Sequence, residues 1–379
     1  MKIAILTLPP HTNYGGILQA YALQTILQRM GHKVDILQKI RGRVHHPLIL
    51  PLVYLRRLAK KIMIDRNIII FAERIQRRES PILEQHISKF FLKHLNLRYI
   101  KSLHDIDSND YNVIVVGSDQ IWRRPYFRSW GLPIKDAFLD FTHNWKIKRI
   151  AYAASFGTDN LNEYSQSEIA ECKHAAKFFD AISVRENSGI TICHDKLAVK
   201  AEFVLDPTML LEKEDYMSLV NQFNAPKSCG DMLCYILDPT PFKDKMIHKI
   251  SKEKELTPFY LEPETYNREI PIENRIKPSV ESWLRGFMDA KFVVTDSFHA
   301  CVFSIIFGKP FMVVANENRG ISRFTSLLRA FHCEECLVFP NDKISQIPIF
   351  LNKDIPNLLK YYKKKSFEFL NQNIPTETT

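Results

Sequence analysis

The stretch TDSFHACVFSIIFGKPFMVV, residues 295–314, contains most of a strand–turn–helix–strand unit near the end of the chain. An apolar strand is predicted over residues 291–295, directly before a polar turn, and an apolar helix over 298–307. Gly308 ends this helix, and a second apolar strand is predicted over 311–314. Two strands joined by a helix in this way are typical of a parallel sheet whose faces are covered by helices.

Three polar residues of the turn, Asp296, Ser297 and His299, are expected at the carboxyl edge of this sheet. The amino terminus of the following helix offers free N–H groups and a favourable potential for anions at that edge. A titratable histidine beside an anion site suits a transferase that uses a phosphorylated donor. In the alternative interpretation the histidine caps its own helix, and Asp296 or Ser297 serves as the N-cap.

Strands and helices alternate along the rest of the chain, which predicts an α/β fold with two Rossmann-like, doubly wound domains facing each other across a cleft. Ligands are expected in the cleft, at the carboxyl ends of the strands. The further strands are predicted over residues 2–8, 33–37, 112–116, 149–154, 181–184, 202–205, 232–237, 258–261 and 336–339. The predicted organisation is an N-terminal domain over 1–198 with a basic helical insertion at 39–100, a C-terminal donor-binding domain over 199–345, and a closing helix and tail over 346–379.

The length and composition of the chain favour a globular protein of two domains. Its 379 residues exceed one ordinary core, and 45% apolar with 25% charged residues is typical of soluble proteins. The apolar runs fall short of the roughly 20 residues of a membrane-spanning helix, and the amino terminus lacks a signal-peptide pattern, so we expect a cytoplasmic protein. Seven scattered cysteines indicate no disulfide framework, and Cys333 and Cys336 have no second pair with which to form a zinc site.

Positive charge is concentrated in one segment, residues 39–79. This segment contains eleven Lys or Arg and three acids, and so carries +8 of the formal net charge of +10. Because the remainder is nearly neutral, we expect no nucleic-acid partner. Apolar residues are interleaved with the basic ones, which predicts peripheral contact with an anionic surface at the inner face of the membrane. The alternative is a solvated helical hairpin over a domain face.

The first strand is followed by Asn13, Tyr14, Gly15 and Gly16, where the chain turns into its first predicted helix. Paired glycines at this point allow the backbone to approach a ligand closely. The spacing is not that of a dinucleotide-binding loop. The alternative is a glycine-bearing turn in which Asn13 acts only as the N-cap.

A second polar turn, which contains Ser118, Asp119, Gln120 and Trp122, follows the apolar strand at 112–116. Carboxylate and amide side chains there can form hydrogen bonds with sugar hydroxyls, and the tryptophan can stack on a pyranose ring. In the alternative interpretation Ser118 or Asp119 caps a helix and Trp122 lies in the core.

Three arginines near predicted strand ends are candidates to bind an anion. Arg185 ends the strand at 181–184, where its guanidinium can hold a phosphate or carboxylate in a fork. In the alternative interpretation Arg185 forms a salt bridge with an acid such as Glu186 or Asp206. Arg319 and Arg323 lie four residues apart on one face of a predicted helix. They are either further anion ligands or part of a solvated basic face.

Together these turns resemble the polysaccharide pyruvyl transferase family, over residues 1 to about 330. Each motif alone is weak evidence for this family, but six motifs in the order of the family are specific to it. The basic insertion and the carboxyl tail lie outside the resemblance. The matching segments are NYGGILQA (13–20), GSDQIW (117–122), AYAASFG (151–157), SVRE (183–186), VLDPT (204–208) and TDSFHACVFSIIFGKPF (295–311).

The resemblance implies a fold similar to that of GT-B glycosyltransferases, and transfer of a pyruvyl group from phosphoenolpyruvate to a sugar of a surface glycan. The product would be a cyclic ketal on two sugar hydroxyls, with release of phosphate. The implied partners are phosphoenolpyruvate as co-substrate, with no other cofactor and no metal, and a glycan acceptor that could be lipid-linked. The reaction needs an acid for the enol methylene, a base for the attacking hydroxyl, and cations for the donor.

The family's functional residues carry over to two positions of this chain. The histidine of the helix-start motif falls on His299, as acid or base, and the strand-end arginine falls on Arg185, as donor ligand. The turns at 13–16 and 118–122 are assigned to the acceptor.

The chain departs from the family directly before this histidine. Known members often have arginine and leucine at the two preceding positions, which here hold Ser297 and Phe298. One donor cation is therefore absent from its expected place, and Arg319 and Arg323 are the candidates to replace it.

Two other classes of protein fit parts of the same sequence. One is a sugar-nucleotide-dependent glycosyltransferase or epimerase of the same fold, because a late Asp-Ser turn followed by Gly-Lys-Pro is similar to turns in such enzymes. The other is a non-catalytic glycan-binding protein of a polysaccharide machine, which would be indifferent to loss of His299 and Arg185.

Overall fold

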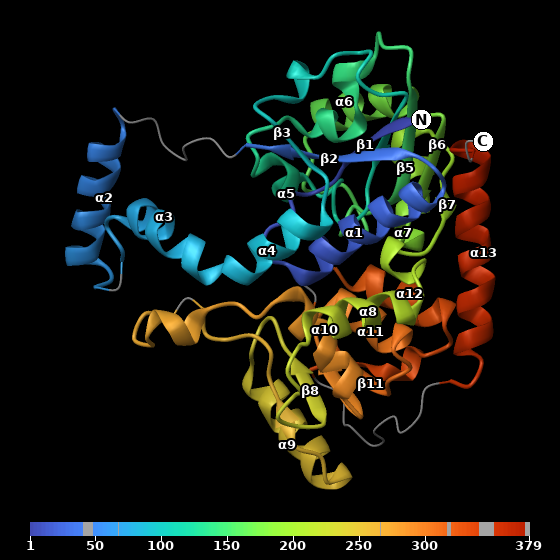
Figure 1. Cartoon of the computed structure of the whole chain (residues 1–379). Helices are drawn as coiled ribbons and strands as arrows, with labels where there is room; N and C mark the ends of the chain where they lie inside the picture. Colours follow the sequence, from blue (N-terminus) through green and yellow to red (C-terminus); the bar gives the residue numbers. More distant parts are fainter. Residues whose placement is uncertain (41–47, 67, 266, 317–319, 341–351, 376–379) are drawn as a thin grey trace.

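The first sheet contains seven parallel strands in the order β3-β2-β1-β4-β5-β6-β7 (Figure 1). The computed structural model describes the whole chain except residues 41–47, 67, 266, 317–319, 341–351 and 376–379. The strands are β1 (Lys2–Leu6), β2 (Lys33–Lys39), β3 (Leu97–Ile100), β4 (Val113–Val116), β5 (Lys148–Ala154), β6 (Ala181–Val184) and β7 (Glu202–Phe203). The central strands are continuous apolar runs because helices cover both faces of the sheet.

Neighbouring residues of the central strand β1 enter two different cores. Ile5 belongs to the core beneath α1 (Tyr14–Arg29), whereas Leu6 belongs to the core beneath α6 (Gln166–Ala176). The core beneath α1 continues into the second domain, so the two domains share apolar packing. The other helices of this part are α4 (Gln85–His94), α5 (Arg124–Arg128) and α7 (Asn187–Ile192).

The second sheet contains five parallel strands in the order β12-β11-β10-β8-β9. They are β8 (Met232–Tyr235), β9 (Pro258–Phe259), β10 (Phe292–Thr295), β11 (Phe311–Val314) and β12 (Leu337–Val338). The helices around this sheet are α8 (Lys213–Phe223), α9 (Pro241–Lys254), α10 (Val280–Asp289), α11 (Phe298–Ile306) and α12 (Ile321–Ala330). Two parallel sheets with helical crossovers confirm the predicted α/β fold with two Rossmann-like domains.

The first helix of the N-terminal domain packs directly against the second domain. The Tyr14 ring stacks on Trp283 of α10, with 5.6 Å between ring centroids, and its hydroxyl donates to the Pro278 carbonyl at 2.9 Å. Near the other end of α1, Arg29 forms an ion pair with Asp215 of α8. These contacts hold the two domains together.

The closing helix α13 (Ile355–Asn373) returns from the second domain to the first, along one side of both (Figure 1). The Leu205 amide donates to the Ser366 hydroxyl at 3.0 Å, and the Lys148 ammonium donates to the Asn373 carbonyl at 2.8 Å. The helix therefore fastens the end of the chain to the sheet in which it began.

Two strands differ from the predictions. β7, which was expected to begin the second domain, pairs with β6 and is the last strand of the first sheet, so this sheet extends beyond residue 198. β3 lies inside the range predicted as a helical insertion, 39–100, and forms the opposite edge of the sheet. Both are short edge strands whose place is fixed by pairing and not by a local apolar run.

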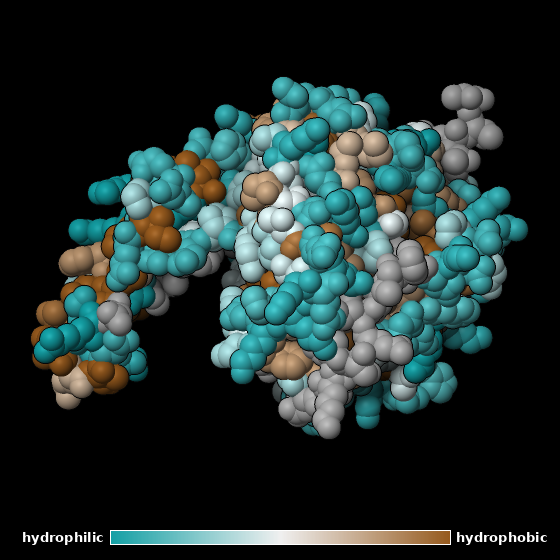
Figure 2. Space-filling view, turned by 90° about the horizontal axis from the view of Figure 1, so that it is seen from below, coloured by the Kyte–Doolittle hydropathy of each residue, from teal (hydrophilic) through white to brown (hydrophobic). Residues whose placement is uncertain are grey.

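Two helices of the insertion form an arm that projects from the body of the molecule (Figures 1 and 2). Its helices are α2 (Leu50–Met63) and α3 (Ala72–Leu83), and no residue of α2 is buried. Among the described residues, no helix has both the length and the apolar character needed to cross a bilayer.

Candidate active site between the two domains

The segments that follow β1, β4 and β10 meet at one small cavity between the domains. Its volume is about 40 Å³. Both domains contribute side chains, because the carboxyl edges of the two sheets face each other. The lining residues are Asn13, Asp119, Gln120, Tyr126, Leu237, Asp296, Ser297, Phe298, His299, Arg323 and Phe324.

Arg185 leaves the end of β6 and lies just behind the cavity, with 2% of its surface exposed. Its guanidinium donates to Asp119 at 2.8 Å and to Asp206 at 2.6 Å. The ion pair with Asp206, one of the alternatives open from the sequence, is therefore present. Burial alone would lower the pKa of this arginine, but the two carboxylates raise it. Arg185 is therefore a buried cation behind the cavity, with its charge balanced by these two carboxylates.

His299 lies in the first turn of α11 and is buried against the first domain. Its Nε2 is 3.6 Å from an Asp206 carboxylate oxygen. The other side of the ring lies against Gly15, where a Cβ atom would come within 2.1 Å of the histidine Nδ1. The glycine predicted to approach a ligand instead makes room for this imidazole.

Asp206, at the end of the first sheet, joins the arginine to the histidine. Besides these two partners, it accepts hydrogen bonds from the Ser118 hydroxyl at 3.3 Å and from the amide and hydroxyl of Thr208 at 3.1 and 2.7 Å. Burial would raise its pKa, but His299, Arg185 and Thr208 outweigh that effect and lower it far below the usual range. The carboxylate is therefore ionised at neutral pH. The sequence motif VLDPT contained this residue, but no local signal showed that it touches the histidine.

Two more acids complete the charged cluster. Asp119 has a left-handed backbone, with φ of 58°, a conformation that aspartate tolerates better than most residues. Burial would raise its pKa, but Arg185, His299 and Arg323 together lower it. Glu186 is fully buried, and burial raises its pKa even though Arg185 is near.

Arg323 of α12 is one of the described residues that line the cavity. Its guanidinium carbon lies 5.3 Å from the centroid of the Phe298 ring, and that of Arg185 lies 4.7 Å from the same ring. Burial and, to a smaller extent, repulsion from Arg185 lower the pKa of Arg323 to about 10. It is still a cation at neutral pH. The companion candidate, Arg319, lies outside the described residues.

The start of α11 keeps its backbone donors available. Ser297 occupies the N-cap position, and no side-chain capping bond is formed at this end of the described helix. The alternative that Asp296 caps the helix is wrong, because its carboxylate accepts from the amides of Leu237 and Asp238 and from the ammonium of Lys243 at 2.7 Å. No side-chain cap therefore occupies the described amides of this helix start, as the predicted anion binding requires, and that binding stays a prediction.

Some residues predicted to bind the acceptor lie at the cavity and others do not. Asn13 and Gln120 line it. Asn13 also accepts from the Gly16 amide at 3.4 Å, so it acts as N-cap as well. Ser118 is buried beneath the cavity against Asp206.

For two aromatic residues the predicted contact with a sugar is wrong. Trp122 is fully buried, stacks on Phe138 at 4.7 Å and donates from its indole N–H to the Ala137 carbonyl. Tyr14 is fully buried under Trp283. A turn sequence does not show which of its side chains point inward, and large apolar rings are buried when the core has room for them.

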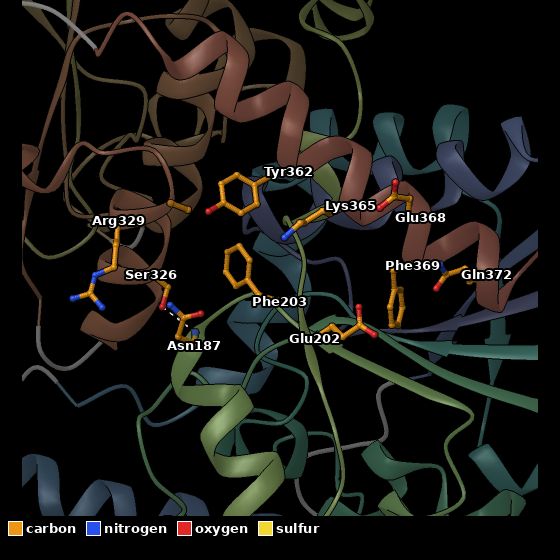
Figure 3. A pocket seen from close by; sticks show the side chains of 11 residues that line it. Asn187, Glu202, Phe203, Ser326, Arg329, Tyr362, Lys365, Glu368, Phe369 and Gln372 are labelled. Atoms are coloured by element: carbon orange, nitrogen blue, oxygen red, sulfur yellow. Dashed lines mark hydrogen bonds between the residues drawn. The ribbon is translucent and has the colours of Figure 1, made fainter.

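A larger cavity lies elsewhere, beside α13, and has a volume of about 550 Å³ (Figure 3). Its charged side chains, Glu202, Arg329, Lys365 and Glu368, are exposed to solvent. None of the buried charged residues described above lines it. The smaller cavity is therefore the better candidate, because buried, interacting charges are typical of active sites.

The chain is similar to known proteins in its fold and matches one known family in its sequence. The chain is similar in structure to UDP-GlcNAc 2-epimerase from Neisseria meningitidis bound to UDP-GlcNAc, at 10% identity and a TM-score of 0.47, covering 100% of this chain and 95% of that one. It is similar to the spinosyn rhamnosyltransferase SpnG complexed with thymidine diphosphate, at 9% identity and a TM-score of 0.40, covering 99% and 93%. No curated protein matches the sequence. Residues 13–318 match the sequence profile described as polysaccharide pyruvyl transferase, and the chain therefore belongs to the polysaccharide pyruvyl transferase family.

Proposed function

We propose that the protein transfers a pyruvyl group from phosphoenolpyruvate to two hydroxyls of one sugar in a surface glycan, with release of phosphate. The observation that carries the proposal is the meeting of His299, Asp206 and Arg323 at one interdomain site. Family membership supports pyruvyl transfer to a polysaccharide.

The chemistry requires two C–O bonds to form at C2 of the donor and one to break. A sugar hydroxyl adds to C2, and the methylene carbon takes up a proton to become a methyl group. The bond from C2 to the phosphate oxygen then breaks, and a second hydroxyl adds in its place. One hydroxyl proton ends on the methyl group and the other on phosphate, so the reaction is balanced with no further reactant.

His299 is the proposed proton carrier between hydroxyl and methylene. Imidazole can hold or release a proton near neutral pH. Asp206 is ionised and lies 3.6 Å from the ring nitrogen Nε2, so it is placed to orient the ring. This gives Asp206 a positioning role that the sequence did not suggest.

Arg323 is the proposed ligand for the donor phosphate or carboxylate, together with the backbone amides that begin α11. It replaces the family arginine that is absent at Ser297. Arg185, which does not line the cavity, positions Asp119 and Asp206 and contributes its charge from behind the Phe298 ring. On the acceptor side, Asn13 and Gln120 offer hydrogen-bonding groups to sugar hydroxyls.

The test is release of phosphate when the protein is incubated with phosphoenolpyruvate and candidate glycans, with the ketal identified by mass spectrometry. Replacement of the proposed proton carrier, His299→Ala, is expected to lower kcat by about 100-fold or more. His194→Ala is the matched control, since His194 also pairs with an aspartate, Asp195, but is 80% exposed and outside the site. Turnover that survives His299→Ala would refute the assignment. A thermal shift with UDP-sugars but none with phosphoenolpyruvate would instead support a sugar-nucleotide enzyme.

A further inference from the structure

The projecting arm carries an unusual share of the exposed apolar surface. Among the described residues, ten of the twenty large apolar side chains that are exposed lie between Leu48 and Phe71. Scattered exposed apolar residues are ordinary, but a contiguous group of them indicates a contact surface. Figure 2 shows this group on the arm, away from the main body.

Four of these residues form one stripe on and just before α2. Leu52, Leu55 and Ile62 are spaced by three and seven positions, which places them on one face of the helix, and Leu48 precedes the helix four positions before Leu52. Leu48, Leu52, Leu55 and Ile62 are 83%, 68%, 63% and 75% exposed. We refer to them as the apolar stripe.

The other face of α2 packs on the segment that leads into α3. The Tyr54 ring contacts the Phe71 ring edge-on at 4.9 Å between centroids. Arg57 forms a bidentate ion pair with Glu73, with distances of 2.7 and 2.8 Å. These contacts fix the rotation of α2, so the apolar stripe points away from the arm.

Basic side chains border the stripe. Arg56 directly follows Leu55 in α2, and Lys60 lies one turn further along on the same side of the helix. α2 contains no acidic residue. α3 adds the exposed Arg74, Arg77 and Arg78. An apolar stripe with basic flanks is the pattern of a helix that lies in a membrane interface.

We propose that the arm lies on an anionic lipid surface, with the apolar stripe at the boundary of headgroups and acyl chains and the basic residues among the headgroups. A second copy of the arm is a poorer partner for the stripe. Two copies would bring only basic flanks together, because α2 has no acid to pair with them. The charge of the arm favours anionic lipid instead.

The base of the arm connects this surface to the site between the domains. Glu79 of α3 pairs with Arg275 at 3.3 Å, and the Leu83 carbonyl accepts from the Lys277 amide at 2.9 Å, so α3 is fastened to the second domain. A cavity of about 280 Å³ between them is lined in part by His11 and Thr12, next to Asn13 of the active site. The arm would thus hold the site near a lipid-borne acceptor. That last step rests on the proposed function, whereas membrane contact does not.

The experiment is flotation of the full-length protein with vesicles of phosphatidylcholine containing phosphatidylglycerol. We expect binding at low salt, and its loss at high salt or with pure phosphatidylcholine. The variant Arg56→Gln/Lys60→Gln is expected to bind about thirtyfold more weakly, from two basic residues near the surface. Leu52→Ser/Leu55→Ser/Ile62→Ser tests the stripe and is expected to abolish binding. Lys291→Gln/Lys364→Gln removes two exposed charges elsewhere and is the matched control.

Folding is checked by thermal unfolding, which these changes are expected to leave within a few degrees because α2 has no buried residue. Failure of the wild-type protein to float would overturn the proposal, as would equal binding by the arm variants and the control. A wild-type dimer in sedimentation velocity that becomes monomeric in the serine variant would also overturn it, in favour of a second copy. Because flotation uses no substrate, its outcome is separate from that of the phosphate-release test.

Discussion

Asp206 is the residue on which the charge balance of the active site depends. It contacts Arg185 at 2.6 Å and lies 3.6 Å from the nearest nitrogen of His299. Its folded-state pKa is lowered, although burial opposes this. An acid whose pKa is lower in the folded state stabilises the protein above its unfolded pKa of about 3.9, and this stabilisation is lost as the pH falls below that value.

For Asp206→Asn we therefore expect a loss of roughly 3–5 kcal/mol in the free energy of unfolding at pH 7, because buried Arg185 keeps only one carboxylate partner. The variant should also lose less stability than the wild type between pH 5 and 3. Urea unfolding at these pH values measures both effects. Asp195→Asn, at the exposed aspartate beside His194, is the control and should change little. Identical acid dependence in Asp206→Asn and wild type would contradict the assignment.

At the scale of elements, the amino-terminal turns of α1 and α11 pack against each other across the domain boundary. Gly15 and Gly16 both lie in α1, but only the first faces the histidine. A Cβ at Gly15 would lie 2.1 Å from the His299 Nδ1 and 2.5 Å from its Cβ. At Gly16 the nearest atoms are 3.6 Å away, which is ordinary contact.

The two glycines thus provide a matched pair of variants. Gly15→Ala should destabilise the protein by about 1–3 kcal/mol and reduce turnover strongly, because either His299 or the whole of α1 must shift. Gly16→Ala should be tolerated in both respects. Chemical unfolding and kcat of the two variants are the measurements. Equal behaviour of the pair would show that the close approach is not a feature of the protein in solution.

The same elements show how far sequence reasoning reaches. Continuous apolar runs followed by polar turns predicted β4, β6 and β10 and the site at their carboxyl ends, because burial on both faces leaves a strong local pattern. β7 has only two residues, so its place in the first sheet depends on pairing with β6. The contact of Asp206 with His299 and the burial of Trp122 depend on packing between distant parts of the chain. No local sequence pattern indicates either of them.

At the scale of the whole molecule, the site is too small for its proposed substrates. The cavity of about 40 Å³ has room for little more than one water molecule, whereas ligand pockets usually occupy about 300–1,000 Å³. The walls come from both domains, and the Tyr14–Trp283 stack and the Arg29–Asp215 ion pair hold those domains together. We therefore expect the domains to move apart when donor and acceptor bind.

A disulfide across the domain boundary tests this movement. The Asn187 backbone amide of the first domain donates to the Ser326 hydroxyl of the second at 3.0 Å, so Asn187→Cys and Ser326→Cys place two cysteine residues at a close contact between the domains. Cys229, the exposed one among the seven free cysteines, is changed to serine to avoid mispairing. We expect oxidation to abolish turnover and binding of phosphoenolpyruvate, and reductant to restore both, because the locked cavity cannot admit a ligand. Each single-cysteine protein, treated with the same oxidant, should keep its activity. A fully oxidised double variant that still turns over would mean that substrates reach the site without domain separation.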